Sequence, residues 1–186
     1  GKSAVDILHK IGKEEKMPVI TEIMDVRDLE YMMDKVDIFQ VGSRNMYNYS
    51  LLKELGKIDK PILLKRGLSA TVKEFLLSAE YIMYEGNEKV ILCERGVRTY
   101  EKCMRNTMDI ATISFLKELT HLPIIADPSH ATGKRNLIEP LSKASIVAGA
   151  DGLLIESHIN PDAAWSDGEQ SLRTFELNNV LKKVKM

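Results

Sequence analysis

The sequence contains six short apolar runs that each end in charged or polar residues, and this pattern constrains the fold more than any other feature. An apolar run of this length is typical of a buried strand, and its polar ending brings charged groups to one edge of a sheet. Most runs precede an amphipathic, helix-like stretch, so strand, loop and helix alternate. This alternation predicts a parallel sheet with a functional site at the carboxyl ends of its strands. The runs are VITEIMD (19–25), IFQVGSR (38–44), ILLKRG (62–67), VILCERG (90–96), IIADPSH (124–130) and LLIESH (153–158).

Helical periodicity and capping signals predict helices around these strands. Successive strands have the spacing of βα units, and eight such units form a barrel of typically about 250 residues. The 186 residues hold six strands, so either the sheet is open and doubly wound or two units of a (β/α)8 barrel precede Gly1. The chain begins inside a predicted helix, which favours the second alternative. The predicted helices cover about 3–16, 26–35, 48–55, 70–85, 106–119, 134–149 and 171–184.

Composition excludes several classes of function. A net charge of −1, without basic patches interleaved with aromatic residues, disfavours nucleic acid and anionic membranes as partners. No apolar run is long enough to span a bilayer, and no GxGxxG motif indicates a dinucleotide site. Cys93 and Cys103 form no disulfide pattern, so the expected compartment is the cytoplasm. Arg98 and Arg105 lie in a long polar connection, for which the alternatives are a phosphate site at the rim and a solvated loop; we favour the loop.

An imidazole and two carboxylates stand at or after strand ends. His130 follows one strand, Glu156 ends the last one, and Asp167 lies in the loop SDGEQS. Such a mixed set suits a divalent ion such as manganese, iron, cobalt or zinc. Spacing alone is not diagnostic, because the same residues could be a surface His, a Glu paired with Arg and a capping Asp. His158 is the competing imidazole, which we interpret as a residue of the rim.

Three cations also end strands: Arg44, Lys65 and Arg95. In a barrel they would converge on one space, and an anionic substrate needs several fixed donors. The alternative is a set of scattered charges paired with neighbouring acids such as Glu94 or Asp127. Burying such cations is costly without partners, so that alternative needs those pairs as well.

Seven stretches, in this order, resemble the 3-deoxy-D-arabino-heptulosonate 7-phosphate (DAHP) synthase family, in its short type I-beta branch. The resemblance implies a (β/α)8 barrel that condenses phosphoenolpyruvate with erythrose 4-phosphate and requires a divalent metal ion. It implies a transferase of the shikimate pathway to aromatic amino acids, which we expect to be a cytoplasmic homo-oligomer. The stretches are TEIMD, QVGSRN, LLKRG, LCERG, DPSHATG, GLLIESH and SDGEQSL.

The resemblance also assigns roles to residues. His130, Glu156 and Asp167 match the family's metal ligands, and its phosphoenolpyruvate ligands match the three cations Arg44, Lys65 and Arg95. Lys65 is in addition the candidate proton donor, and Lys65 and His130 are the candidate catalytic residues.

The family's Gly-Pro-Cys motif, whose Cys is a metal ligand, and its Lys-Pro-Arg-Thr-Ser motif do not occur in this sequence. We therefore expect residues 1–186 to form a single catalytic barrel domain without the first two strands, and no regulatory domain is visible. Two alternatives stay open. One is 3-deoxy-D-manno-octulosonate 8-phosphate synthase or a related phosphoenolpyruvate–sugar synthase. The other is an inactive fragment or interaction module.

Overall fold

The computed structural model describes residues 1–184, and the chain divides into two compact units. The first comprises Gly1–Gly67 and Lys73–Ile91. The second comprises Leu68–Val72 and the described residues from Leu92 onward. Both units consist of parallel strands that alternate with helices, as the six apolar runs predict.

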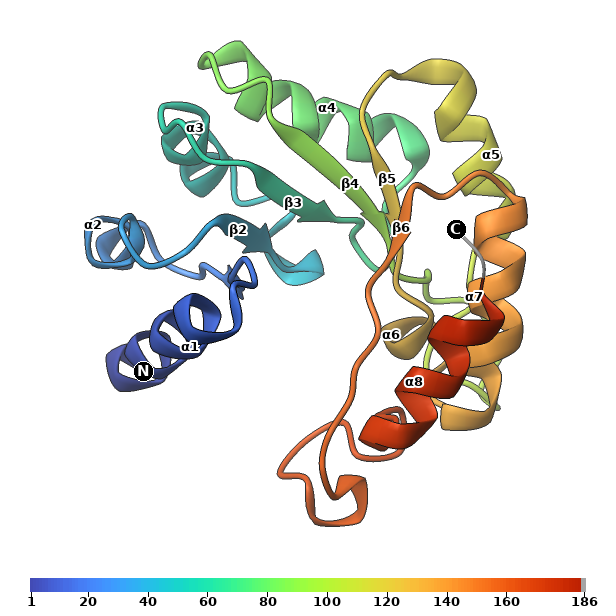
Figure 1. Cartoon of the computed structure of the whole chain (residues 1–186). Coiled ribbons are helices and arrows are strands. Elements are labelled where there is room, and N and C mark those ends of the chain that lie inside the picture. Colours follow the sequence, from blue (N-terminus) through green and yellow to red (C-terminus); the bar gives the residue numbers. More distant parts are fainter. Residues whose placement is uncertain (185–186) are drawn as a thin grey trace. The chain divides into compact units, whose positions relative to one another are not determined.

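In the first unit, strands β1 (Ile20–Glu22), β2 (Ile38–Val41) and β3 (Ile62–Lys65) pair in parallel and in chain order. Phe39 and all apolar residues of β3 are completely buried, which places the core of this unit on the sheet. Figure 1 shows α2 and α3 beyond the strands that they connect. The helical segments are α1 (Lys2–Glu15), η1 (Val26–Asp28), α2 (Leu29–Met32), η2 (Ser43–Asn45), α3 (Tyr49–Gly56) and α4 (Val72–Tyr84).

The second unit holds the last three residues of β4 (Val90–Glu94) together with β5 (Ile124–Ala126) and β6 (Gly152–Leu153), and these strands are again parallel and in chain order. The last two helices lie side by side in Figure 1, and Ile138, Leu172 and Val180 form a buried apolar cluster there. The helical segments are α5 (Ile110–Leu119), α6 (Pro128–Thr132), η3 (Arg135–Leu137), α7 (Ile138–Val147), η4 (Pro161–Ala163) and α8 (Thr174–Lys183).

Side-chain caps explain where several of these helices begin. Asn48 accepts a hydrogen bond from the Leu51 amide at the start of α3, and Asp109 accepts one from the Thr112 amide at the start of α5. Such caps satisfy amide groups that have no partner within the helix. The predicted helix at 106–119 therefore begins only after Asp109.

Further helices differ from the prediction as well. The segment predicted as a helix over 134–149 begins as the 3-10 turn η3, and α7 starts only at Ile138. The segment predicted as a helix over 26–35 is a 3-10 turn followed by the four-residue α2. The short α6 was not predicted, because its sequence, PSHAT, is too brief to show helical periodicity. It is formed because Asp127 caps it, Pro128 occupies its first turn and Gly133 ends it in the left-handed conformation.

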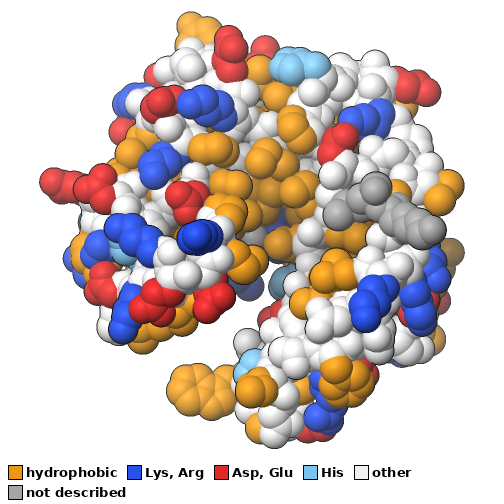
Figure 2. Space-filling view, viewed as in Figure 1, with side chains coloured by type: hydrophobic (Ala, Val, Ile, Leu, Met, Phe, Trp, Pro, Cys, Tyr) orange, Lys and Arg blue, Asp and Glu red, His pale blue; other side chains and the backbone are white. Residues whose placement is uncertain are grey.

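On the face that Figure 2 shows, positive and negative side chains are interspersed around α1 and α2. Asp6 of α1 pairs with Lys35, which follows α2, at 2.6 Å, and the Lys35 ammonium also lies over the Tyr31 ring. Within residues 1–184, no helix is both long enough and apolar enough to cross a bilayer.

Candidate metal and anion site

The local structure around α6 places His130. Asp127 follows β5 directly, and its Oδ1 accepts a hydrogen bond from the His130 amide at 2.9 Å. Its other oxygen lies 2.8 Å from Nδ1 of the same histidine, although the angles are not those of a hydrogen bond. A fully buried carboxylate beside Nδ1 favours a proton on that nitrogen, which leaves Nε2 able to accept a metal ion.

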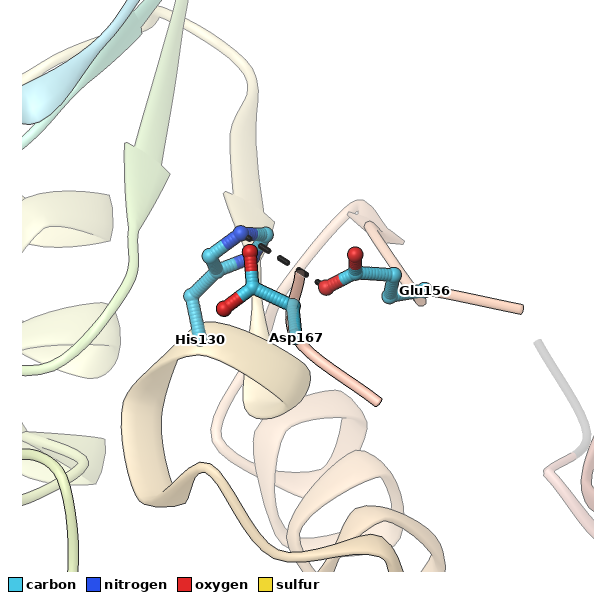
Figure 3. A group of neighbouring side chains, drawn as sticks. All are labelled: His130, Glu156 and Asp167. Carbon is cyan, nitrogen blue, oxygen red and sulfur yellow. Dashed lines mark ion pairs between the residues drawn. The ribbon is translucent and has the colours of Figure 1, made fainter. Parts of the chain in front are cut away.

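The three predicted metal ligands lie together in the second unit (Figure 3). His130, Glu156 and Asp167 each offer a ligand atom, and these atoms all lie within 4.8 Å of one another. His130 Nε2 is 3.7 Å from Glu156 Oε2. Two ligands at about 2.0–2.2 Å from one ion lie at most about 4.4 Å apart, so small side-chain shifts suffice to bind a divalent cation. One imidazole and two carboxylates fit such an ion.

Each acidic member of the cluster has its own backbone support. The Glu156 amide donates to Ser129 Oγ at 2.9 Å, which joins the segment after β6 to α6. Asp167 adopts a positive φ of 56°, a conformation that side chains other than Gly, Asn and Asp rarely adopt. The Ser171 hydroxyl donates to the Asp167 carbonyl at 3.0 Å and closes the turn. Strain of this kind is common at functional sites.

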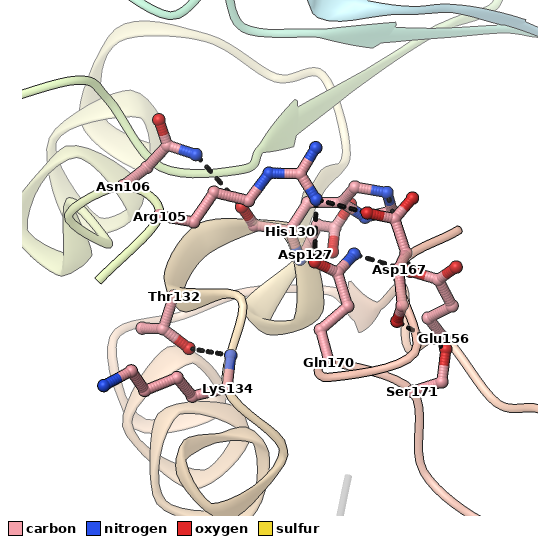
Figure 4. A network of polar contacts seen from close by, with 10 residues as sticks. All are labelled: Arg105, Asn106, Asp127, His130, Thr132, Lys134, Glu156, Asp167, Gln170 and Ser171. Atoms are coloured by element: carbon pink, nitrogen blue, oxygen red, sulfur yellow. Dashed lines mark hydrogen bonds and ion pairs between the residues drawn. The ribbon is translucent and has the colours of Figure 1, made fainter. Parts of the chain in front are cut away.

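A network of polar contacts surrounds the two acids (Figure 4). Arg105 Nη1 donates to Asp167 Oδ1 at 2.5 Å and to Gln170 Oε1 at 2.7 Å. Gln170 Nε2 in turn donates to Glu156 Oε2 at 2.6 Å. The backbone of Arg105 is held by a hydrogen bond from its amide to the Thr132 carbonyl. Arg105 thus lies in an exposed loop, as predicted, but hydrogen bonds fix both its guanidinium and its backbone.

Arg95 immediately follows β4 and is 5% exposed. Its Nε and Nη1 atoms are buried without a hydrogen-bond partner. Burial lowers the pKa of the Arg95 guanidinium, and the nearby Arg105 charge lowers it further, whereas Asp127 opposes the shift. Unpaired donors on a buried cation are costly, so this arrangement favours an anionic ligand that would accept from them.

The other two predicted anion ligands belong to the first unit. Arg44 lies in η2, directly after β2, and is exposed. Lys65 is the last residue of β3 and is 5% exposed. Both therefore stand at strand ends, as predicted. Their binding of a common ligand with Arg95 stays a prediction.

Asp127 and Gln170 contact the cluster but had no predicted role at the site, whereas Arg105 was considered only as a phosphate ligand of the rim. Asp127 could have been identified as a cap, since it precedes Pro128 at the end of an apolar run. Gln170 has no comparable signal, because its two partners are distant in the sequence. His158 is exposed and lies outside the cluster of ligand atoms, which agrees with its interpretation as a residue of the rim.

The whole chain has a counterpart among known protein families. A family model described as the DAHP synthetase I family matches residues 1–186. Phospho-2-dehydro-3-deoxyheptonate aldolase of Thermotoga maritima is 48% identical over 177 residues, which cover 95% of this chain and 52% of that protein. The chain thus spans about half the length of this relative. A 2-dehydro-3-deoxyphosphooctonate aldolase of Francisella tularensis is 28% identical over 193 residues.

Solved structures are similar over nearly the whole length of this chain as well. A truncated form of 3-deoxy-D-arabino-heptulosonate 7-phosphate synthase from Thermotoga maritima superposes with a TM-score of 0.96 at 45% identity. The match covers 98% of this chain and 70% of the truncated one. This likeness confirms the predicted fold class, a (β/α)8 barrel of which six βα units lie in this chain.

Proposed function

The chain belongs to the DAHP synthetase I family, and on that premise we propose that the protein condenses phosphoenolpyruvate with erythrose 4-phosphate. Carbon 3 of phosphoenolpyruvate attacks the aldehyde carbon of the sugar phosphate, and water adds at carbon 2. Phosphate then leaves by cleavage of the carbon–oxygen bond, which gives DAHP. The protein would be a metal-dependent transferase at the first step of the shikimate pathway.

The metal would be held by His130, Glu156 and Asp167, whose donor atoms suit manganese, iron, cobalt or zinc. A bound divalent ion would supply Lewis-acid polarisation of the aldehyde oxygen. Asp127 contacts His130, one of the proposed ligands, from outside and would keep it oriented.

The buried guanidinium of Arg95 is the observation that supports this function most directly. Its unpartnered Nε and Nη1 can donate hydrogen bonds to the oxygens of a carboxylate or phosphate group. Arg44 and Lys65 are proposed to bind the same substrate because their stretches, QVGSRN and LLKRG, match the family. The three cations would stabilise the departing phosphate. Lys65 would in addition act as a proton donor in the reaction.

Replacement of Arg95 by methionine tests the anion site. Charged hydrogen bonds contribute about 1.5–3 kcal/mol, so we expect Arg95→Met to weaken phosphoenolpyruvate binding by at least tenfold in isothermal titration calorimetry. The melting temperature should change little, because the lost cation has unpaired buried donors. Arg98→Met, in an exposed position three residues later, is the matched control. Equal affinity of wild type and Arg95→Met would contradict the assignment.

A second candidate function is 3-deoxy-D-manno-octulosonate 8-phosphate synthesis, because relatives of 27–29% identity are named 2-dehydro-3-deoxyphosphooctonate aldolases. Phosphate release with erythrose 4-phosphate and with arabinose 5-phosphate discriminates between the two, and we expect turnover with the four-carbon sugar. A chain that shows neither turnover nor phosphoenolpyruvate affinity would instead be an inactive fragment or interaction module.

A cytoplasmic location is part of the proposal, because both substrates are phosphorylated anions that do not cross membranes unaided. We also propose a homo-oligomer as the working state, which light scattering after size-exclusion chromatography measures. A monomer at the concentration of the activity assay would contradict this part alone.

A further inference from the structure

Gln170 is a buried polar residue at the site to which neither the family resemblance nor the proposed reaction assigns a role. It is 2% exposed, and its side chain contacts two residues that are themselves separated by 51 positions, Arg105 and Glu156. A buried amide needs partners for both its carbonyl and its amino group. Both kinds of partner are present here, so the amide is held at both ends.

The direction of the amide follows from the chemistry of its neighbours. The guanidinium of Arg105 can only donate, so the carbonyl oxygen of Gln170 must face it. The amino group then faces Glu156 and donates to Oε2 at 2.6 Å. An ionised carboxylate only accepts, so the reversed amide would lose both hydrogen bonds. The orientation is therefore determined without ambiguity.

A single nitrogen atom, Nη1 of Arg105, connects the two acids of the cluster, one directly and the other through Gln170. Arg105 Nη1 carries two hydrogens, and its two acceptors are Asp167 Oδ1 and Gln170 Oε1. Asp167 is thus linked to Glu156 through Arg105 and Gln170. Two neighbouring carboxylates repel each other, and the guanidinium offsets this repulsion. Gln170, which the same guanidinium holds in place, in turn fixes the position of the Glu156 carboxylate.

The backbone that carries Gln170 also carries Asp167. The backbone amide of Gln170 donates to the Asp167 carbonyl at 3.2 Å, and the backbone amide of Ser171 donates to the same carbonyl at 3.1 Å. Asp167 and Gln170 therefore belong to one closed turn whose geometry is set locally. The side chain of Gln170 reaches from this turn to the segment that follows β6.

We propose that Gln170 is a positioning residue for the metal site: its amide, oriented by Arg105, holds the Glu156 carboxylate where it can ligate a divalent ion. The inference rests on the proposed function for the ligand roles of Glu156 and Asp167, and it extends that function by a specific hydrogen-bond donor. Groups that orient metal ligands from outside typically contribute 10–100-fold to metal affinity.

Two substitutions separate hydrogen bonding from packing. Gln170→Met keeps the side-chain length and fills the space but removes both hydrogen bonds. Gln170→Glu keeps an acceptor for Arg105 but has no amino group to donate to Glu156. We expect both variants to bind Mn²⁺ about 10–100-fold more weakly than wild type, measured by electron paramagnetic resonance of free Mn²⁺. The absorption spectrum of bound Co²⁺ should change as well, which a mere loss of packing would not cause.

Asn178→Met is the matched control, since Asn178 is an exposed amide in α8 of the same unit. It should bind Mn²⁺ like wild type. Unchanged Mn²⁺ affinity and Co²⁺ spectrum in Gln170→Met would overturn the proposal, because packing alone would then be sufficient.

A crystallographic comparison distinguishes failure of this inference from failure of the proposed function. If the wild-type chain binds no divalent ion, the metal assignment fails. Metal-free crystals of wild type and Gln170→Met still decide the positioning role. Displacement of the Glu156 carboxylate in the variant supports it, and an unmoved carboxylate overturns it.

Discussion

At the scale of single residues, the position of Arg105 depends on a glycine. Gly133 ends α6 with a φ of 67°, and a Cβ at this position would lie 2.8 Å from the Cβ of Arg105. Atoms of this kind do not approach so closely, so any larger residue must displace the segment that carries Arg105. Because Arg105 contacts Asp167 and Gln170, this displacement would reach the proposed metal site.

Gly133→Ala should therefore weaken Mn²⁺ binding, by several-fold or more, in addition to the cost of about 1 kcal/mol for a positive φ. Gly86→Ala is the control, because Gly86 also has a positive φ, of 113°, but nothing lies within 4 Å of an added Cβ. This variant should lose stability in thermal melts while its Mn²⁺ affinity stays unchanged. If the two variants bind Mn²⁺ equally, Gly133 has no influence on the site.

At the scale of elements, Asp151 joins three parts of the second unit. It precedes β6, accepts a hydrogen bond from the Ile124 amide at the start of β5, and pairs with Lys117 of α5 at 2.9 Å. Burial alone would raise the pKa of the Asp151 carboxyl, but the hydrogen bonds from Lys117 and Ile124 outweigh it and leave the pKa below its usual value. The folded state therefore favours the charged carboxylate.

This shift predicts how stability depends on pH. A carboxyl whose pKa is lower in the folded than in the unfolded state stabilises the fold above its unfolded pKa of about 4 and loses that contribution as the pH falls. Asp151→Asn should thus be less stable than wild type at pH 7, by about 1 kcal/mol. The difference should shrink in denaturant titrations at pH 3. A difference that is equal at both pH values would exclude the charge of Asp151 as its cause.

At the scale of the whole molecule, the proposed metal ion would couple segments that are distant in the chain. His130 comes from α6, Glu156 from the segment after β6, and Asp167 from the loop that precedes α8. A ligand that binds only the folded state stabilises it by about 2.7 kcal/mol when present at one hundred times its dissociation constant. For a chain of this size, that free energy raises the melting temperature by about 5–10 °C.

We therefore expect Mn²⁺ to raise the melting temperature and a chelator to reverse the increase. His130→Ala should abolish the increase. His158→Ala should retain it, because His158 is an exposed imidazole outside the cluster of ligand atoms. An equal response of both variants to Mn²⁺ would show that the ion binds elsewhere.

Much of this organisation could be predicted from local patterns. The parallel strands are visible as apolar runs, and α1, α3 and α4 follow from helical periodicity and capping residues. The proposed metal ligands were predictable in part, since each stands at or after a strand end. The limits of α2 and α5 were not predicted correctly, because a short 3-10 turn and a late cap at Asp109 leave little trace in periodicity.

Local patterns in the sequence establish which residue types stand at the strand ends, because a strand needs only a short apolar run and a helix only its own period and caps. The partners of Arg105 and Gln170, in contrast, follow only from the packing of distant segments. These two residues meet across 65 positions, and Arg105 meets Asp167 across 62. No local pattern encodes such contacts, since they depend on how the loops around α6 and before α8 pack together. For the same reason, only the folded chain shows that the donors of Arg95 are left unpaired.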